Sequence, residues 1–316
     1  MVPTLLAGAT VVLGVVLASE RGPTTSSSDR LRTAAGASGR PAECRKTVRG
    51  ALTIWDHARE PQRHRYCDLL GRAHGLLDSS PEAARDAASL ANQIFPGKAA
   101  PHVLMGRAYV RMRDDQQALA AFGKARQLDP RSIEEPGALH DLAMTQVRAG
   151  NRQEATLTYR ILVPRLDLYS NVNERVHVLL EAGCLAMSRG PEYADEAISL
   201  LTLARNQPLT KHSPVVLAML GLALDRALLP EQTEAVLDLL QRAGGASALS
   251  AIDPATLDYL ADPSEWLAAV AISWERQDPA RAVALWQQYL DSQPAEPKAA
   301  RAKARMAGLR KPAGGP

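Results

Sequence analysis

The stretch AAPHVLMGRAYVRMRDDQQALAAFGKARQLDPRS, residues 99–132, decides the fold. Counted from Ala99, the positions that carry its pattern are 8, 11, 20, 24, 27 and 32, occupied by Gly106, Tyr109, Ala118, Phe122, Ala125 and Pro130. The three small residues let two helices cross closely, and the two rings fill the gap between them. The proline ends the second helix and forces a turn. The stretch therefore predicts a pair of packed helices.

This pattern resembles the tetratricopeptide repeat (TPR), a family built from helix-turn-helix units of 34 residues. The family places Trp at position 4 and Leu at position 7, and the chain departs there with His102 and Met105. The resemblance implies an all-α, right-handed solenoid. It also implies that the concave face, formed by the first helix of each unit, holds extended peptides or partner helices.

The same register recurs along residues 64–296. Position 8 of the successive units is occupied by Gly71, Gly106, Ala143, Gly183, Gly221 and Val270, at spacings of 35, 37, 40, 38 and 49. The excess over 34 is expected in the turns, and the largest excess is expected to hold a short helix at Pro254–Leu260. We predict about six units between a capping helix at 44–59 and a terminal helix at 297–310, because each unit buries its face only against a neighbour.

The composition agrees with closely packed helices. Hydrophobic residues make up 46% of the chain but aromatic residues only 4%, so the few rings are expected in the core. Those at repeat positions are Tyr109, Phe122, Tyr159, Trp266 and Trp286. Arg accounts for 30 of the 37 basic residues, which is typical of a GC-rich bacterial genome. The basic residues do not alternate with stacking aromatics, so a nucleic-acid partner is not predicted.

The amino-terminal residues 1–19 carry no charged side chain. They are predicted to be a secretory signal cleaved after Ala18, an uncleaved membrane anchor or an ordinary buried helix. No Lys or Arg precedes the run. Residues 20–42, rich in Gly and Ser, are predicted to be a flexible linker. We expect a repeat domain over 43–310 and a disordered tail at 311–316.

The sequence contains no recognisable catalytic motif. It lacks a Gly-Lys-Ser/Thr phosphate loop, a His-Glu-x-x-His pair and a Gly-x-Ser-x-Gly elbow. We therefore predict a protein that is not an enzyme and needs no cofactor or metal. His64, Cys67 and His74 fall along one helix face, where packing is favoured over metal binding. The pairs Asp114-Asp115 and Glu134-Glu135 are interpreted as acids at helix turns.

The three cysteines leave one pairing open. If 44–59 and 62–78 form an antiparallel hairpin, Cys44 and Cys67 are offset by about 15 Å along the helix axis. A disulfide needs Cα atoms within about 7 Å, so the bond requires Cys44 to leave the helix and fold back. Cys184 is predicted to be a half-buried small residue.

The predicted function is that of a non-catalytic scaffold or adaptor in a bacterial cell envelope, exported to the periplasm or anchored in the membrane. It would bind a peptide or partner helix on the concave face. The candidate partner-binding residues are Arg65, Arg72, Arg107, Arg111, Met144, Arg148, Arg226 and Trp274. The same face is predicted to be apolar in the middle, at Leu180, Met187 and Leu222. The alternatives are a cytosolic regulatory adaptor and an accessory subunit of an envelope enzyme or secretion complex.

Overall fold

The computed structural model describes residues 44, 60–252, 257, 260 and 262–310. The predicted signal or anchor, the linker, the disordered tail and nearly all of the capping helix at 44–59 lie outside these residues. Within them the structure is α-helical without a β-strand. No helix of the described part is long and apolar enough to cross a bilayer.

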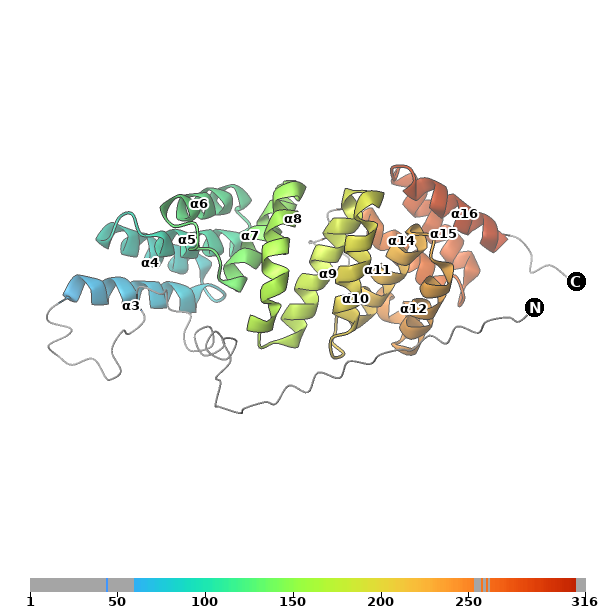
Figure 1. The fold of residues 1–316 in the computed structure, drawn as a ribbon, viewed down its shortest axis with the longest axis horizontal. Coiled ribbons are helices and arrows are strands. Elements are labelled where there is room, and N and C mark those ends of the chain that lie inside the picture. Colours follow the sequence, from blue (N-terminus) through green and yellow to red (C-terminus); the bar gives the residue numbers. More distant parts are fainter. Residues whose placement is uncertain (1–43, 45–59, 253–256, 258–259, 261, 311–316) are drawn as a thin grey trace, which may run out of the picture. The chain divides into compact units, whose positions relative to one another are not determined.

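The described residues form six successive helical hairpins, which are followed by a terminal helix (Figure 1). The hairpins are α3 (Pro61–Leu76) with α4 (Pro81–Ile94), α5 (Ala99–Arg111) with α6 (Asp115–Leu128), α7 (Pro136–Arg148) with α8 (Arg152–Leu162), α9 (Val172–Arg189) with α10 (Ala194–Arg205), α11 (Ser213–Arg226) with α12 (Pro230–Arg242), and α14 (Ser264–Trp274) with α15 (Pro279–Asp291). The terminal helix is α16 (Lys298–Arg310). Each hairpin packs on the next, so the predicted solenoid of about six units is confirmed.

Three shorter elements of the described part take up excess residues, two of them between units and one, η3, inside the fourth hairpin. The 3₁₀ turns η2 (Val163–Leu168) and η3 (Pro191–Tyr193) precede α9 and α10. The short helix α13 (Gly245–Ser250) lies between α12 and α14. This helix begins beside Gly244 and Gly245, whose positive φ angles of 104° and 60° turn the chain after α12. The short helix predicted at Pro254–Leu260 lies outside the described residues, apart from Leu257 and Leu260.

Local signals explain where the helices begin. Proline occupies the first turn of α3, α4, α7, α11, α12 and α15, where its missing N–H would have no helical partner. Asp114 accepts a hydrogen bond from the Gln117 N–H, and Glu135 accepts from the Gly137 and Ala138 N–H groups. Members of both acidic pairs therefore serve as helix caps, as predicted for turn acids.

The repeat positions form the core. Phe122 and Trp286 are fully buried and Tyr159 and Trp266 nearly so, whereas Tyr109 is half-buried. A Cβ atom built at Gly106 would lie 3.0 Å from the Phe122 ring. A Cβ at Gly71, which occupies the same repeat position, would meet nothing within 4 Å. The close crossing therefore holds in the second unit but not in the first.

The buried side chains form two clusters. One comprises α3, α4 and the side of α5 that carries Leu104 and Ala108. The other begins with Ala99 and Val110 on α5 and continues to α16. Cys184 belongs to the second cluster and is buried rather than half-buried.

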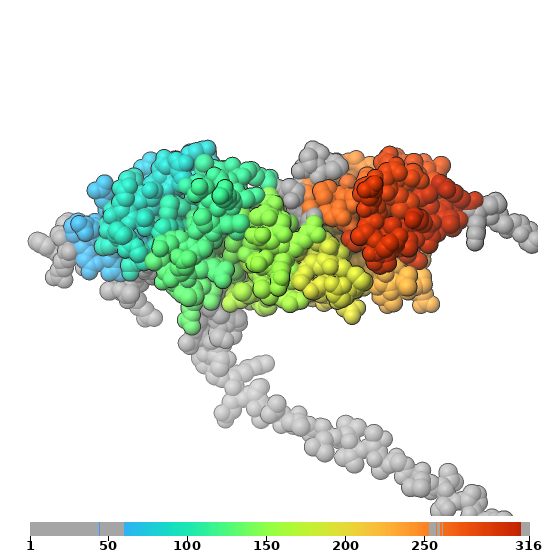
Figure 2. Space-filling view, turned by 90° about the horizontal axis from the view of Figure 1, so that it is seen from above, coloured from blue at the N-terminus to red at the C-terminus, as the bar shows by residue number. Residues whose placement is uncertain are grey.

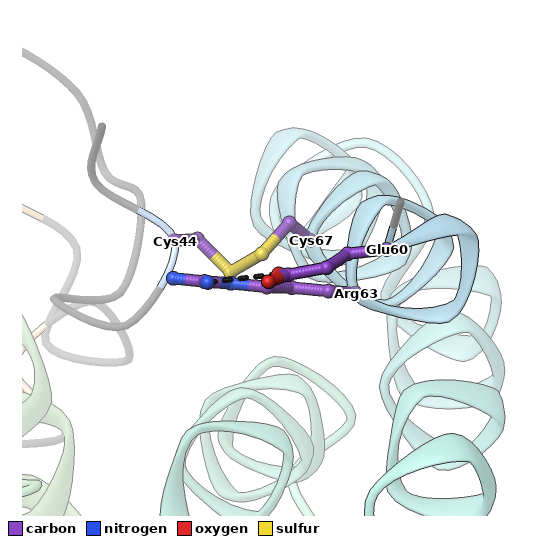
Figure 3. The surroundings of a disulfide bond; sticks show 4 residues. All are labelled: Cys44, Glu60, Arg63 and Cys67. Atoms are coloured by element: carbon purple, nitrogen blue, oxygen red, sulfur yellow. Dashed lines mark hydrogen bonds and ion pairs between the residues drawn. A yellow bond between two sulfur atoms is a disulfide. The ribbon is translucent and has the colours of Figure 1, made fainter. Parts of the chain in front are cut away.

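Cys44 and Cys67 form a disulfide, with 5.6 Å between their Cα atoms (Figure 3). This settles the pairing that the sequence left open. Cys67 lies in the second turn of α3, so the bond ties a residue 23 positions upstream to the first hairpin. Beside it, Arg63 forms an ion pair with Glu60 at 2.9 Å.

Candidate interaction surface

The predicted partner-binding residues lie on the first helices of the hairpins. Arg65 and Arg72 are on α3, where both side chains are exposed. The other six, on α5, α7, α11 and α14, are partly buried: Arg107, Arg111, Met144, Arg148, Arg226 and Trp274. We call the first helix of each hairpin helix A, and the side of the array that carries these residues the helix-A face. Its arginines are not equivalent, because the partly buried ones contact carboxylates of neighbouring helices.

Arg107 and Arg111 converge on one buried carboxylate. They are one turn apart on α5, so their side chains lie on the same side of the helix. The Arg107 Nε donates to Asp141 Oδ2 at 2.7 Å, and the Arg111 Nη1 donates to the other oxygen. Asp141 is on α7 and is only 7% exposed. A buried carboxylate is stable only when it is paired, so Asp141 fixes both guanidinium groups.

Each of these arginines also has an outer, exposed partner. The Arg107 Nη1 lies 3.4 Å from Glu135 Oε2, and the Arg111 Nε donates to Asp78 Oδ1 at 3.0 Å. The side chains of Glu135 and Asp78 are 59% and 87% exposed. Burial acts to lower the pKa of Arg111, but the charges and hydrogen bonds of Asp141 and Asp78 together outweigh it and the pKa is raised. Arg107 and Arg111 therefore share one buried inner partner, and each has a solvated outer partner.

Two further predicted residues link neighbouring elements in the same way. The Arg148 Nη2 donates to Asp115 Oδ1 at 2.5 Å, which joins α7 to the first turn of α6. Arg226 donates to Glu265 and, at 3.0 Å, to the Tyr289 hydroxyl. The structure therefore brings the predicted arginines to acids that the sequence did not assign to the site. The acids Asp141, Asp115 and Glu265 are each 30 residues or more from the arginines that they contact.

The apolar middle predicted for this face is wrong. Leu180, Met187 and Leu222 are 0%, 7% and 1% exposed. On α11 every residue from Val215 to Asp225 is buried, and a helix that is apolar all round is packed on all sides. Met144 packs partly buried against the core. Trp274, also partly buried, lies under the Arg281 guanidinium, 4.1 Å from the ring centre.

A second polar centre surrounds Glu181, which is 1% exposed on α9. Its Oε2 lies 2.5 Å from His140 Nε2 of α7 and accepts from the Tyr159 hydroxyl of α8 at 2.9 Å. Its Oε1 lies 3.0 Å from His177 Nε2. Burial acts to raise the pKa of Glu181, but the two histidines outweigh it and hold the pKa far below the ordinary value.

This centre extends to the next hairpin. The His177 ring stacks on His212 with 4.8 Å between ring centres, and His212 stands at the start of α11. Despite its burial, His140 has a raised pKa because Glu181 attracts the proton. No group of three or more metal-binding side chains with suitable geometry is found in the described part of the chain. The centre therefore joins three consecutive hairpins, the first two through ion pairs and hydrogen bonds and the third through ring stacking.

Several solved structures resemble the chain, whereas no family model and no curated protein sequence matches it. PilF of Pseudomonas aeruginosa is 16% identical, with a TM-score of 0.45 over 73% of this chain and 99% of its own. YrrB, described as a TPR protein with an unusual peptide-binding site, is 17% identical, with a TM-score of 0.40 over 70% of this chain and 99% of its own. The Cut9–Hcn1 hetero-tetramer of the APC/C is 17% identical, with a TM-score of 0.38 over 91% of this chain and 60% of its own.

The class of the protein is defined by its own hairpins. Six units repeat the helix-turn-helix geometry, with Ala118, Phe122 and Ala125 buried where the 34-residue pattern places them. The chain is an α-solenoid of TPR-like units.

Proposed function

We propose that the chain is a non-catalytic interaction scaffold that binds an acidic peptide segment of a partner protein through Arg107 and Arg111. The observation that carries this proposal is the convergence of both guanidinium groups on Asp141. Because their inner side is fixed by a buried partner, the two forks are held in place before a ligand arrives. A fixed fork loses little side-chain entropy when it binds a carboxylate.

The outer partners of the two arginines, Asp78 and Glu135, can be replaced by carboxylates of such a ligand. Asp78 and Glu135 are exposed and belong to different segments, between α3 and α4 and before α7. A partner carboxylate replaces them one for one, and exposed ion pairs are worth only about 0–1 kcal/mol each. Asp141 stays in place beneath and keeps the arginines oriented. Arg65 and Arg72 on α3 add exposed positive charge to the same face.

The test uses two sets of variants with opposite expected effects. Arg107→Lys with Arg111→Lys keeps the charge that Asp141 needs but removes the forks, so recovery of crosslinked partner from cells should fall by about tenfold. Asp78→Asn with Glu135→Gln removes the competing carboxylates, so recovery should rise. Arg205→Lys, an exposed position on α10, is the matched control. Equal recovery with all three variants would refute this binding site.

We further propose that the scaffold works outside the cytoplasm, in the bacterial cell envelope. The disulfide supports this location, because such bonds persist in oxidising compartments and are rare in the cytosol. The uncharged residues 1–19 are consistent with a signal or an anchor. Cell fractionation with amino-terminal sequencing tests it: a chain that begins at Met1 in the cytosol, with Cys44 and Cys67 open to alkylation, would leave a cytosolic regulatory adaptor.

An accessory subunit of an envelope enzyme or secretion complex is a narrower form of the same proposal. Crosslinking in intact cells separates the two forms. Recovery of an enzyme or a secretion component through the Arg107–Arg111 site would favour the subunit role.

A further inference from the structure

The terminal helix α16 is unusually basic for a helix that closes a core. Its sequence KAARAKARMAGLR contains two Lys and three Arg and no acidic residue. Its buried residues are Ala299, Ala302 and Met306, two of which have only a methyl side chain. The apolar area that holds α16 on the array is therefore small, and most of its specific contacts are ionic. Figure 2 shows α16 in red at the surface of the carboxyl-terminal end.

The cations of α16 reach past the preceding hairpin to a buried acid. Both oxygens of Asp225 on α11 accept from Arg301, at 2.9 and 2.5 Å. Arg305 also donates to Asp225, at 2.8 and 2.5 Å. Asp225 is fully buried and lies 76 and 80 residues from these arginines in the sequence. Burial acts to raise its pKa, but the hydrogen bonds from Arg301 and Arg305 keep the pKa below the ordinary value.

Two more carboxylates complete the contact. Lys298 donates to Glu265 Oε1 at 2.7 Å, and Arg305 donates to Glu275 Oε2 at 2.9 Å. Glu265 is 3% exposed, on α14, and Glu275 directly follows that helix. We call Asp225, Glu265 and Glu275 the acidic seat. Its carboxylates come from two hairpins, so α16 lies across both.

We propose that the acidic seat is a recognition site for a basic helix of a partner protein, and that α16 is its occupant in cis. The partner helix would carry cations spaced as Lys298, Arg301 and Arg305 are, at i, i+3 and i+7, which places them on one helix face. Small residues must lie between the cations, as Ala299 and Ala302 do, so that the helix approaches closely. The occupant is basic because an apolar or acidic helix would deprive the buried Asp225 of both arginines. Glu265 and Glu275 would keep their contacts with Arg226 and the Trp286 Nε1, but each would lose a cation.

Such a partner must displace α16, and the thin apolar contact makes this exchange feasible. The neighbouring helix α15 anchors itself with two buried rings, Trp286 and Tyr289, whereas the largest buried side chain of α16 is Met306. Docking that rests on ion pairs weakens with ionic strength, because salt screens them. Exchange between α16 and a partner helix is therefore expected to depend on salt.

The exchange can be measured with a fluorescein-labelled peptide of residues 296–310 and the full-length chain. Arg301→Gln with Arg305→Gln in the chain should free the acidic seat and raise peptide affinity by about tenfold or more, since the tethered competitor is lost. Lys303→Gln with Arg310→Gln removes the same charge at exposed positions of α16 and should bind the peptide like wild type. Adding Asp225→Asn to the Arg301→Gln, Arg305→Gln chain should abolish binding of the labelled peptide.

A second measurement keeps the proposal testable if the Arg301→Gln, Arg305→Gln chain does not fold, which circular dichroism would show. Excess peptide added to the wild-type chain should speed hydrogen exchange in α16 and leave α3 unchanged. A peptide with the same two substitutions should have no effect. The proposal is overturned if saturating peptide leaves the exchange of α16 unaltered, or if the folded variants all bind the peptide equally.

Discussion

At the scale of single residues, the repeat geometry depends on glycines that touch the opposite helix. A Cβ atom built at Gly183 would lie 2.7 Å from Leu201 Cγ, and Leu201 is fully buried. We expect Gly183→Ala to reduce the free energy of unfolding by about 1–3 kcal/mol, because the buried side chain has no room to move. The midpoint of urea unfolding measures the effect.

The matched control occupies the same repeat position in the first unit. A Cβ at Gly71 would meet nothing within 4 Å. Gly71→Ala should leave stability unchanged or raise it by up to about 1 kcal/mol, since alanine is the better helix former. Equal effects of the two substitutions would contradict the close crossing of α9 and α10.

His212 makes the stability of the array depend on pH. Burial, together with the charges of His177 and Lys211, lowers its pKa to about 4, although Glu181 acts in the opposite direction. Since the ordinary value is 6.5, the unfolded chain binds a proton first as the pH falls. His212 therefore reduces stability between about pH 6.5 and 4.5, by about 1–2 kcal/mol after solvent screening of the partly exposed ring.

His212→Asn should flatten this part of the stability profile and preserve the start of α11, since Asn is a good N-cap. Thermal unfolding of both chains between about pH 7.5 and 4.5 measures the difference. The raised pKa of His140 has the opposite sign: its contribution is present below pH 6.5 and is lost as the pH rises. Parallel profiles for wild type and variant would refute the role of His212.

At the scale of elements, the sequence predicts helices better than it predicts their contacts. The small and aromatic positions of residues 99–132 repeat locally, so α5 and α6 follow from them directly. The rings of Tyr159, Trp266 and Trp286 were expected in the core and are buried there. The short helix α13 was not predicted, and it follows two glycines with positive φ that turn the chain after α12. The helix predicted at Pro254–Leu260 lies almost wholly outside the described residues and stays a prediction.

The sequence predicted the arginines of the candidate site but not the acids that hold them. Arg107 and Arg111 stand out as cations on one helix face, but Asp141 is an unremarkable acid 30 residues further on. The contacts of Arg301 with Asp225 span 76 residues and two hairpins. No local pattern predicts such pairs, because they depend on how successive hairpins are rotated against one another. The partner-binding role of the eight predicted residues stays a prediction.

The disulfide is the other contact at this scale with a measurable consequence. In the chain-entropy model, a bond between residues 23 apart stabilises the folded state by about 3 kcal/mol. We expect Cys44→Ser with Cys67→Ser to lower the melting temperature and to make it insensitive to reductant. The wild-type chain should lose the same stability on reduction. A wild-type melting temperature that does not respond to reductant would contradict a structural role for this bond.

At the scale of the whole molecule, the division of the core into two clusters predicts unequal stability along the array. The first cluster is the smaller one and holds α3, α4 and one side of α5, whereas the second joins the remaining hairpins to α16. In an array each unit is stabilised by its neighbours, so a hairpin that shares a small cluster is expected to open at lower free energy than one inside a large cluster. Native-state hydrogen exchange should show α3 and α4 opening together, before α9 and α11.

Substitutions in the two clusters test this division. Leu70→Ala removes a fully buried side chain of the first cluster and should speed exchange in α3 and α4 while leaving α14 and α15 unchanged. Trp286→Ala in the second cluster should speed exchange in α14 and α15 while leaving α3 and α4 unchanged. Each substitution should lower the opening free energy of its own cluster by about 2–5 kcal/mol. If either substitution accelerated exchange equally in every helix, the array would unfold as one cooperative unit and the division would be wrong. Retained exchange protection in α3 and α4 of the Trp286→Ala chain would show that the amino-terminal hairpin, which the disulfide joins to Cys44, holds its fold independently of the carboxyl-terminal core.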